Sequence, residues 1–357
     1  MCKLSKIIVR PRLESTDIKN ILVIRPGGIG DAVLLFPALK ELRRAYPHSV
    51  ICVLCEKRNF GVFNICPYID EIIEYDKSPL GILAVFSKNF DLVIDTEQWH
   101  RLSAVLAFLT RAPVRVGYST NNRKSLFTNE VEYSHSDYEA DSFLRLVSSL
   151  TGIEYRFDAN LPFLKTDFEI KEGLVEEIGQ YSKGKKALIG IFQGATIRER
   201  KWGVKKFAEL SKRISAENIG VVLLGGESDK KESKEFDILL AGSEYLNLVD
   251  KTTLSETIKV ISRLDLLVSG DTGLMHLAYS VGTPTLSLFG AGIREKWAPK
   301  GDNDIVLDKN LHCSPCTRFG YTPSCPIGVK CLGEISVDEV ESHLMEFINK
   351  SLIEYRF

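Results

Sequence analysis

The feature that most constrains the fold is an alternation of short apolar strands and helical stretches, which runs along the first half of the chain and then starts again. In the first run we predict strands at Ile21–Arg25, Val50–Leu54, Glu71–Tyr75, Leu92–Asp95 and Val114–Tyr118. The predicted helices of this run are Asp31–Ala45, Leu80–Ser87, Leu102–Leu109 and Asp141–Leu150. Such an alternation is typical of parallel sheets that are covered by helices on both faces.

The second run starts near residue 187. Its predicted strands are Ala187–Phe192, Val221–Leu224, Leu246–Val249, Leu266–Ser269 and Thr285–Phe289. Its predicted helices are Lys205–Ser215, Lys230–Leu240, Ser255–Ser262 and Leu274–Ser280, and Val337–Ile353 has the pattern of a terminal amphipathic helix. A length of 357 residues allows two domains with their own cores.

We therefore predict an α/β protein of two Rossmann-like, doubly wound domains that face each other across a cleft. The expected bounds are 1–165 for the first domain and 187–336 for the second. A charged hinge at 166–186 lies between them, and a terminal helix at 337–357 follows.

Charge is nearly balanced over the whole chain, with 46 Lys and Arg against 47 Asp and Glu, so no nucleic-acid partner is expected. The N-terminal half is nevertheless basic, and residues 98–129 contain no acidic residue. The basic residues of this segment are Arg101, Arg111, Arg115, Arg123 and Lys124. Such a segment suits an anionic partner or a membrane surface; the alternative is a set of ordinary solvated faces.

No targeting or spanning segment is evident. The lysines that follow Met1 are not succeeded by an apolar stretch of signal-peptide length. The uncharged run Thr272–Ile293 contains several glycines and a proline, and it divides into helix, turn and strand, which a membrane span would not do. We expect a cytoplasmic protein.

A glycine turn, Gly27–Asp31, follows the first predicted strand. Glycines at this position leave the top of a sheet open to a ligand. Val33 stands where a dinucleotide-binding fingerprint needs a small residue, so that pattern does not match. Asp31 is an unusual residue in a turn of this kind. It is either a helix N-cap or a general base that projects into the cleft, and the two roles are compatible.

A second turn, Ser269–His276, joins an apolar strand to a helix. Gly270 and Gly273 let a phosphate approach the backbone, and the first N–H groups of a helix favour an anion. Asp271 would repel a phosphate, so it should contact hydroxyl groups or a cationic side chain. The alternative interpretation is a well-capped helix with a core histidine at His276.

A third segment, Gln193–Trp202, follows the first strand of the second run and therefore lies at the same sheet edge as Asp271. Its basic residues, Arg198, Arg200 and Lys201, suit a pyrophosphate leaving group, on which charge grows as the bond breaks. A cluster of this kind by itself also fits a solvated loop.

Together these segments resemble glycosyltransferase family 9, the heptosyltransferases of lipopolysaccharide core assembly. The resemblance is carried by Arg25–Pro37 (RPGGIGDAVLLFP), by Arg200–Trp202 and by Gly270–Gly290 (GDTGLMHLAYSVGTPTLSLFG). It implies a GT-B fold and an inverting transfer that needs no metal or other cofactor, usually from ADP-heptose. The acceptor would be an anionic, lipid-linked saccharide, and peripheral contact with the inner membrane would bring the enzyme to it.

The resemblance also suggests roles for individual residues. Asp31 would be the base and Lys201 would bind the diphosphate, so these two are the predicted catalytic residues. The expected donor-binding residues are Thr196, Glu232, Asp271, Thr272, Gly273, Leu274 and His276, and the expected acceptor-binding residues are Arg25, Gly30, Arg101 and Arg123. Glu227 and Glu232 both remain candidates for the acid that binds the ribose.

This chain departs from the family pattern at two points. Gly290–Gly292 reads Gly-Ala-Gly where Gly-Pro-Thr is frequent, so one contact to the phosphate or the sugar is in doubt. Leu274 replaces a frequent proline. Two functions of other classes stay open, namely a sugar-nucleotide epimerase and a non-catalytic nucleotide-binding scaffold. An epimerase would not need a basic acceptor surface, and a scaffold would not need Asp31 in the cleft.

Four cysteines are clustered near the C-terminus, within a predicted insertion at 311–332. They are Cys313, Cys316, Cys325 and Cys331. In a cytoplasmic protein such a cluster more often binds a metal than forms disulfides, and four thiolates suit a structural zinc or iron ion, with His312 as a spare ligand. The gaps between the cysteines match no standard zinc finger, so the alternative is a loop of reduced thiols. Iron-binding versions are also part of what the resemblance allows.

Overall fold

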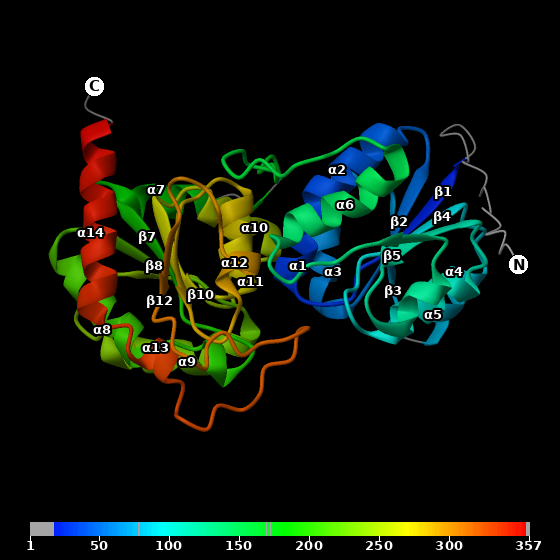
Figure 1. Cartoon of the computed structure of the whole chain (residues 1–357). Helices are drawn as coiled ribbons and strands as arrows, with labels where there is room; N and C mark the ends of the chain where they lie inside the picture. The colour runs from blue at the N-terminus through cyan, green and yellow to red at the C-terminus, as the bar shows by residue number, and fades with distance from the viewer. Residues whose placement is uncertain (1–17, 78, 169, 172, 355–357) are drawn as a thin grey trace, which may run out of the picture.

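The computed structural model describes residues 18–77, 79–168, 170–171 and 173–354, which form two parallel six-stranded sheets side by side (Figure 1). The first sheet has the order β3-β2-β1-β4-β5-β6. Its strands are β1 Asn20–Ile24, β2 Val50–Cys55, β3 Glu71–Glu74, β4 Leu92–Asp95, β5 Val114–Tyr118 and β6 Asn129–Val131. The helices of this half are α1 Ile29–Leu34, α2 Phe36–Ala45, α3 Lys57–Phe63, α4 Pro79–Phe86, α5 Arg101–Leu109, the 3-10 turn η2 Asn121–Leu126, and α6 Glu139–Thr151.

The second sheet has the order β12-β11-β10-β7-β8-β9. Its strands are β7 Leu188–Phe192, β8 Gly220–Leu223, β9 Leu246–Asn247, β10 Leu266–Gly270, β11 Thr285–Phe289 and β12 Ile305–Asp308. Its helices are α7 Leu174–Ser182, α8 Val204–Ala216, α9 Lys230–Leu239, α10 Leu254–Ile261, α11 Gly273–Ser280, α12 Arg294–Trp297, α13 Lys330–Gly333 and α14 Val337–Glu354, with short 3-10 turns η3 Arg198–Arg200 and η4 Glu227–Asp229. The predicted pair of doubly wound sheets is confirmed.

The structure differs from the predicted elements at several places. The helix predicted over Asp31–Ala45 divides at Leu35, because Pro37 lies in the first turn of α2, where a residue without an N–H donor costs no hydrogen bond. Helix α3 and the edge strands β6 and β12 were not predicted. The predicted hinge contains the helix α7.

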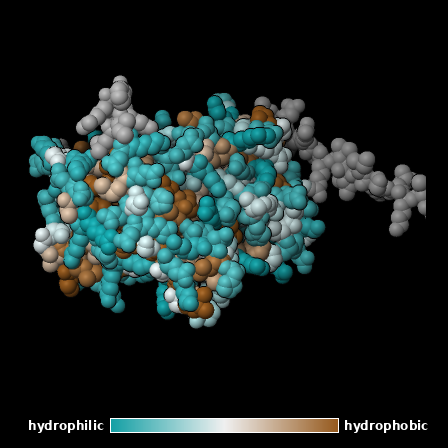
Figure 2. Space-filling model, turned by 60° about the vertical axis from the view of Figure 1, so that its left-hand side comes forward, coloured by the Kyte–Doolittle hydropathy of each residue, from teal (hydrophilic) through white to brown (hydrophobic). Residues whose placement is uncertain are grey.

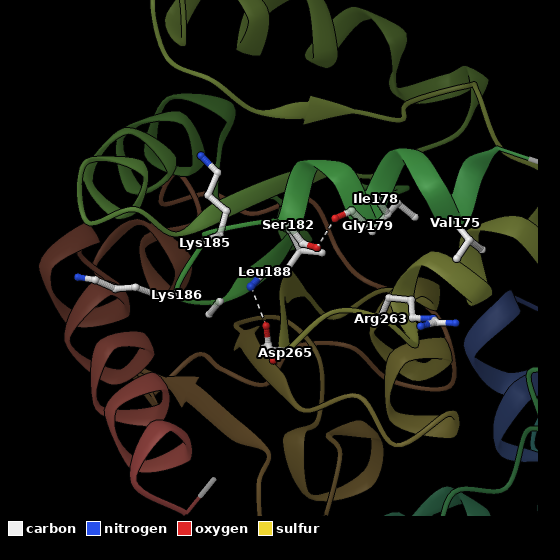
Figure 3. A pocket seen from close by; sticks show the side chains of 10 residues that line it. Val175, Ile178, Gly179, Ser182, Lys185, Lys186, Leu188, Arg263 and Asp265 are labelled. Atoms are coloured by element: carbon white, nitrogen blue, oxygen red, sulfur yellow. Dashed lines mark hydrogen bonds between the residues drawn. The ribbon is translucent and has the colours of Figure 1, made fainter. Parts of the chain in front are cut away.

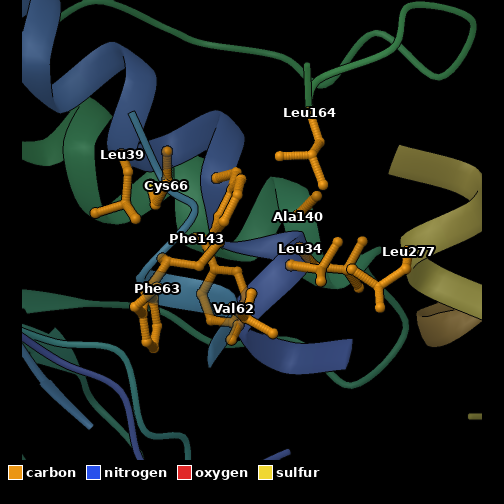
Figure 4. Packing of buried hydrophobic residues seen from close by; sticks show 14 of the residues in the cluster. Leu34, Leu39, Val62, Phe63, Cys66, Ala140, Phe143, Leu164 and Leu277 are labelled. Atoms are coloured by element: carbon orange, nitrogen blue, oxygen red, sulfur yellow. The ribbon is translucent and has the colours of Figure 1, made fainter. Parts of the chain in front are cut away.

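The two halves share a buried contact at the point where α1 meets α11. Figure 4 shows Leu34 of α1 beside Leu277 of α11, within a cluster that also includes Ala140 and Phe143 of α6. All four side chains are almost fully buried. The helix that follows β1 in one half therefore packs directly on the helix that follows β10 in the other, which brings two carboxyl strand ends together.

On the face shown in Figure 2, hydrophilic residues predominate and hydrophobic residues form small separate patches. Within the part of the chain that the structure describes, no helix has the length and hydropathy needed to cross a membrane.

Candidate active site

The site is built where α1 and α11 begin. A Cβ atom on Gly30 would lie 2.4 Å from Cδ2 of His276, and one on Gly273 would lie 2.7 Å from Cβ of Ile29. Real side-chain atoms do not approach so closely, so each glycine is required by the helix that faces it. The two turns predicted from the sequence, one in each half, therefore meet at a single place.

Asp31 lies in this place at the third position of α1, whose N-cap is Gly28, so the alternative role of Asp31 as the N-cap residue itself is not what the structure shows. Its Oδ2 accepts the N–H of Gly28 at 3.2 Å, and its Oδ1 lies 3.1 Å from Nη2 of Arg25. The side chain is 26% exposed. The carboxylate thus has a capping contact and a cationic neighbour, and it still reaches solvent, as a group that takes a proton from a substrate must.

Arg25 is buried directly behind Asp31. Its Nη1 donates to the carbonyl of Thr96 at 2.9 Å, and its guanidinium lies over the ring of Phe143. Burial alone would lower the pKa of Arg25, but Asp31 and two further carboxylates, Glu97 and Glu139, raise it above its ordinary value. Arg25 therefore stays charged and can hold Asp31 in one orientation.

His276 is buried in α11 against Gly30. Burial lowers its pKa to about 4, although Asp271 and Asp31 oppose this shift. Its imidazole is therefore neutral near neutral pH. Its Nδ1 has no hydrogen-bond partner among the described residues, and a buried ring nitrogen in this state is suited to a polar ligand atom.

Asp271 follows β10 and lies beside Arg200, with 3.3 Å between Oδ2 and Nη1. The pair is close enough for charge attraction, but Oδ2 of Asp271 has no partner with hydrogen-bond geometry in the described chain. Of the two kinds of partner expected for Asp271, hydroxyl groups and a cationic side chain, the structure places the second beside it. Both amide atoms of buried Gln193, at the end of neighbouring β7, also lack a partner. Unsatisfied buried groups at adjacent strand ends indicate a place for a polar ligand.

The turn before α11 is preformed. Thr272 is the N-cap of α11, and its Oγ1 lies 2.8 Å from Oγ of Ser269. The side chain of Thr272 makes no capping hydrogen bond to the first N–H groups of this eight-residue helix. Gly273 and Leu274, the next two residues, are only partly buried, so the helix start is open to an anion.

Lys201 lies near the same edge, and its Nζ donates to Oε1 of Glu232 at 2.8 Å. This contact lowers the pKa of Glu232. Glu227, the other candidate for the ribose contact, lies in η4 and is exposed. Thr196 is exposed in the loop that follows β7.

The expected acceptor residues are placed very differently from one another. Arg101 is exposed at the start of α5, and Gly30 faces His276. Arg123 is a correction to the sequence prediction: it is almost fully buried, pairs with Asp95 and donates to the carbonyl of Glu97. Its guanidinium supports the loop after β4 from inside and cannot reach an acceptor.

The predicted metal ligands are not gathered as a ligand set. Cys313 is exposed, Cys316 and Cys325 are half-buried, and Cys331 is buried against Gly290. Burial, followed by the charges of the other three thiols, raises the pKa of Cys331, which places the four in one neighbourhood. Among the described residues, however, no group of three or more His, Cys, Asp or Glu side chains is arranged to hold a metal ion.

Sequence reasoning missed a buried ion pair between the halves. Nζ of Lys296, in α12, lies 2.7 Å from Oε2 of Glu139, the first residue of α6, and both side chains are almost fully buried. Glu139 also accepts hydrogen bonds from Gln98 and from Tyr133, the latter at 3.1 Å. Nothing in the spacing of these residues links them.

A separate pocket of about 350 Å³ lies at the opposite edge of the second sheet (Figure 3). It is lined by residues of α7 and by the start of β7, where the N–H of Leu188 donates to Asp265 at 2.7 Å. Because it lies at the amino end of β7, it is remote from the strand ends that carry Asp271 and Gln193, and we assign it no part in the chemistry.

Comparison with known proteins connects this geometry to one family. The model of glycosyltransferase family 9 (heptosyltransferase) matches residues 83–322. The lipopolysaccharide core heptosyltransferase OpsX of Haemophilus influenzae is 22% identical over 301 residues, which cover 81% of this chain and 84% of that protein.

Solved structures share the fold over nearly the whole chain. A family 9 glycosyltransferase from Veillonella parvula superposes with a TM-score of 0.74 at 22% identity and covers 95% of this chain and 99% of its own. The ADP-heptose lipopolysaccharide heptosyltransferase II of Escherichia coli gives a TM-score of 0.69 at 21% identity and covers 93% and 99%, respectively. The fold is therefore GT-B, as predicted.

Proposed function

Because the chain belongs to glycosyltransferase family 9, we propose that it transfers a heptose or a related sugar from a nucleoside-diphosphate sugar to a saccharide hydroxyl group. ADP-heptose is the proposed donor, since a structural relative is named for it. The proposed acceptor is an anionic, lipid-linked saccharide of the lipopolysaccharide core, reached from the cytoplasmic face of the inner membrane. The observation that supports this most directly is the meeting of Asp31 with the start of α11 at the contact between Gly30 and His276.

In the proposed mechanism Asp31 takes the proton of the acceptor hydroxyl while that oxygen attacks the anomeric carbon of the donor. The bond from this carbon to the diphosphate oxygen breaks on the opposite face, so the configuration inverts. Arg25 holds the base, 3.1 Å from Asp31. The nucleoside diphosphate leaves with both electrons of the broken bond, and preorganised donors stabilise that charge.

The leaving group would lie against the N–H groups of Thr272–Leu274 and the ammonium of Lys201. Lys201 and Glu232 are paired at 2.8 Å. When the donor binds, the ammonium of Lys201 would contact the diphosphate, and the carboxylate of Glu232 would accept hydrogen bonds from the ribose hydroxyl groups. The contact between the two side chains would then be broken or shared with the donor. Asp271, with Arg200 beside it, would accept hydrogen bonds from hydroxyl groups of the donor sugar. His276 would contribute a neutral ring nitrogen.

The direct test is a transfer assay. The protein is first screened for thermal stabilisation by a set of nucleotide sugars, and the stabilising donors are then incubated with a heptose-free core saccharide. We expect ADP-heptose to stabilise the protein and the product to gain one heptosyl unit by mass analysis. Donor consumption in which the sugar is changed but not transferred would instead identify an epimerase. A chain that binds nucleotide without any turnover would be a scaffold.

Lys201→Ala should weaken both donor binding and turnover. A charge-assisted bond to phosphate contributes about 1.5–3 kcal/mol, so we expect affinity for ADP to fall by at least about tenfold. Calorimetry with ADP measures this. Lys205→Ala is the matched control, because Lys205 is an exposed lysine in the first turn of α8, four residues after Lys201. Equal ADP affinity in the two variants would mean that the Arg198–Lys201 segment is a solvated loop.

The cysteine cluster supports a separate proposal, a structural zinc or iron ion held by Cys313, Cys316, Cys325 and Cys331. Because the thiols are not arranged as ligands here, binding requires segment 311–332 to rearrange. We expect about one equivalent of zinc or iron in protein purified under reducing conditions, and its loss in Cys313→Ser. Less than about a tenth of an equivalent in the wild type would exclude the site.

A further inference from the structure

We propose that the outer face of α5 is a docking surface for an anionic lipid bilayer. This face consists of Leu102, Val105, Phe108 and Leu109, and we call it the α5 stripe. The inference deepens the proposed function, since it assigns the surface on which the enzyme would meet a lipid-linked acceptor.

The α5 stripe is an exposed apolar surface on a well-packed helix. Its side chains are 61%, 40%, 48% and 51% exposed, in chain order. The opposite face of α5 packs on the first sheet, where Ala104 and Ala107 are buried in a hydrophobic cluster. Residues spaced three and four apart share one face of a helix, so the stripe is continuous. Helix α4 covers the same cluster and adds exposed Leu83 and Phe86.

Such a face indicates a partner. Single exposed apolar side chains are ordinary, but a contiguous patch of large ones marks an interaction site or a membrane contact. In Figure 1, α5 lies at the outside of the N-terminal half.

Charge favours a bilayer as the partner. Arg101 precedes the stripe and Arg111 follows it, and both are exposed. The guanidinium of Arg115 lies 5.6 Å from the ring centre of Phe108, so a cation also borders the stripe along its side. The segment 98–129 contains no acidic residue. An apolar helix face bordered by arginines matches an anionic lipid surface, in which acyl chains lie beneath phosphate groups.

A second copy of the chain is a poorer partner for the same surface. A symmetric dimer places the same patch on both subunits, so the arginines at the two ends of the stripe would face each other without an acidic complement. Lipid phosphates supply the negative charge that this segment lacks.

The position of α5 connects the stripe to the site. The helix begins just after the loop that follows β4, and Arg25 holds that loop by its bond to the carbonyl of Thr96. In the same loop, Trp99 stacks on Phe319 of the second half, with 3.9 Å between ring centres. The stripe therefore starts at the rim where the halves meet, so a saccharide anchored in a docked bilayer would have a short path to Asp31.

The test is sedimentation with vesicles that contain no saccharide, which separates docking from transfer. We expect the wild type to bind vesicles of equal parts phosphatidylethanolamine and phosphatidylglycerol, and to bind phosphatidylcholine vesicles at least about tenfold more weakly, since several basic residues contribute to the difference. Leu102→Ser with Phe108→Ser should lower binding to the anionic vesicles about tenfold or more. Arg111→Asp should lower it at least about fivefold, because one basic residue near the surface contributes about 1 kcal/mol.

The matched control is Ile238→Ser, which removes a 77% exposed apolar side chain from α9 in the other half and should leave vesicle binding unchanged. The Leu102→Ser, Phe108→Ser variant should retain wild-type transfer to a delipidated, water-soluble acceptor. If neither the wild type nor any variant transfers a sugar, the proposed function is wrong, but the docking surface is still tested by vesicle binding alone.

Two results would overturn the docking surface. One is that the wild type binds neither kind of vesicle, or that the Leu102→Ser, Phe108→Ser variant binds the anionic vesicles as tightly as the wild type does. The other is a dimer by light scattering that becomes a monomer in the stripe variant without any change in vesicle binding, because the stripe would then be an interface between copies of the chain.

Discussion

Asp31→Asn is expected to lower turnover by at least about 10²-fold while affinity for ADP-heptose stays near the wild-type value, since a general base contributes about 10²–10⁴-fold. The amide keeps the size of the carboxylate and can still accept the N–H of Gly28 through its oxygen, so the cap of α1 is retained. What it loses is the capacity to take a proton from the acceptor hydroxyl. Single-turnover kinetics with saturating donor measure the loss, and calorimetry measures donor affinity.

The matched control is Asp141→Asn. Asp141 also lies in the first turn of a helix and also accepts a backbone N–H, that of Phe157 at 3.0 Å, but it is outside the site. Its variant should transfer at the wild-type rate. If Asp31→Asn also transfers at nearly that rate, Asp31 is a capping residue only, and the base must be sought among the other groups that face the cleft.

The positions of the proposed catalytic and donor-binding residues could be predicted from the sequence because they depend on a general rule. In a parallel sheet, loops that follow the strands lie at one edge, so Asp31, Asp271 and Lys201 could be assigned to strand ends before the fold was known. The fold itself was equally accessible, since strands buried on both faces are continuous apolar runs, as in Val50–Cys55 and Leu188–Phe192. Two edge strands were missed: β6, Asn129–Val131, contains no apolar run, and the apolar run of β12 is only three residues long, Ile305–Leu307.

Side-chain direction in irregular segments was not accessible. Arg123 lies in a short 3-10 turn, and nothing in its neighbours indicates that it points inward to Asp95 instead of outward to a ligand. Nor did the sequence indicate what lies beside Gly292. A Cβ atom on Gly292 would lie 2.1 Å from Oδ2 of Asp271, so a larger residue at this position would displace the carboxylate proposed to hold the donor sugar.

Contacts between the halves were the least predictable, because each joins segments far apart in the chain with no shared pattern. One of these contacts is the buried pair of Lys296 and Glu139. Nζ of Lys296 also donates to the carbonyls of Ser134 and Asp137, both at 3.2 Å, and lies 4.3 Å from the ring centre of Tyr133. Its charge is therefore fully enclosed, and its partners all come from the other half.

Lys296→Met is expected to destabilise the protein by about 3–5 kcal/mol at neutral pH, because it leaves the buried charge of Glu139 without its cation. Glu139→Gln in the same chain should recover a large part of this loss, since the remaining pair of neutral side chains carries no unpaired charge. Urea denaturation of the two single variants and the double variant measures the coupling between the two residues. Lys309→Met is the control, because its ion pair with Glu339 is partly exposed, and such pairs contribute only about 0–1 kcal/mol.

The effect of Lys296→Met should also depend on pH with a definite sign. Burial raises the pKa of Glu139 in the folded protein, and Lys296 opposes that rise. Without Lys296 the folded state binds the proton of Glu139 more tightly than the unfolded state does, so stability increases as the pH falls toward the ordinary range of a glutamate. We therefore expect a smaller deficit near pH 5 than near pH 7. A deficit below about 1 kcal/mol at both pH values would mean that water reaches Glu139, and hence that the two halves separate at this contact in solution.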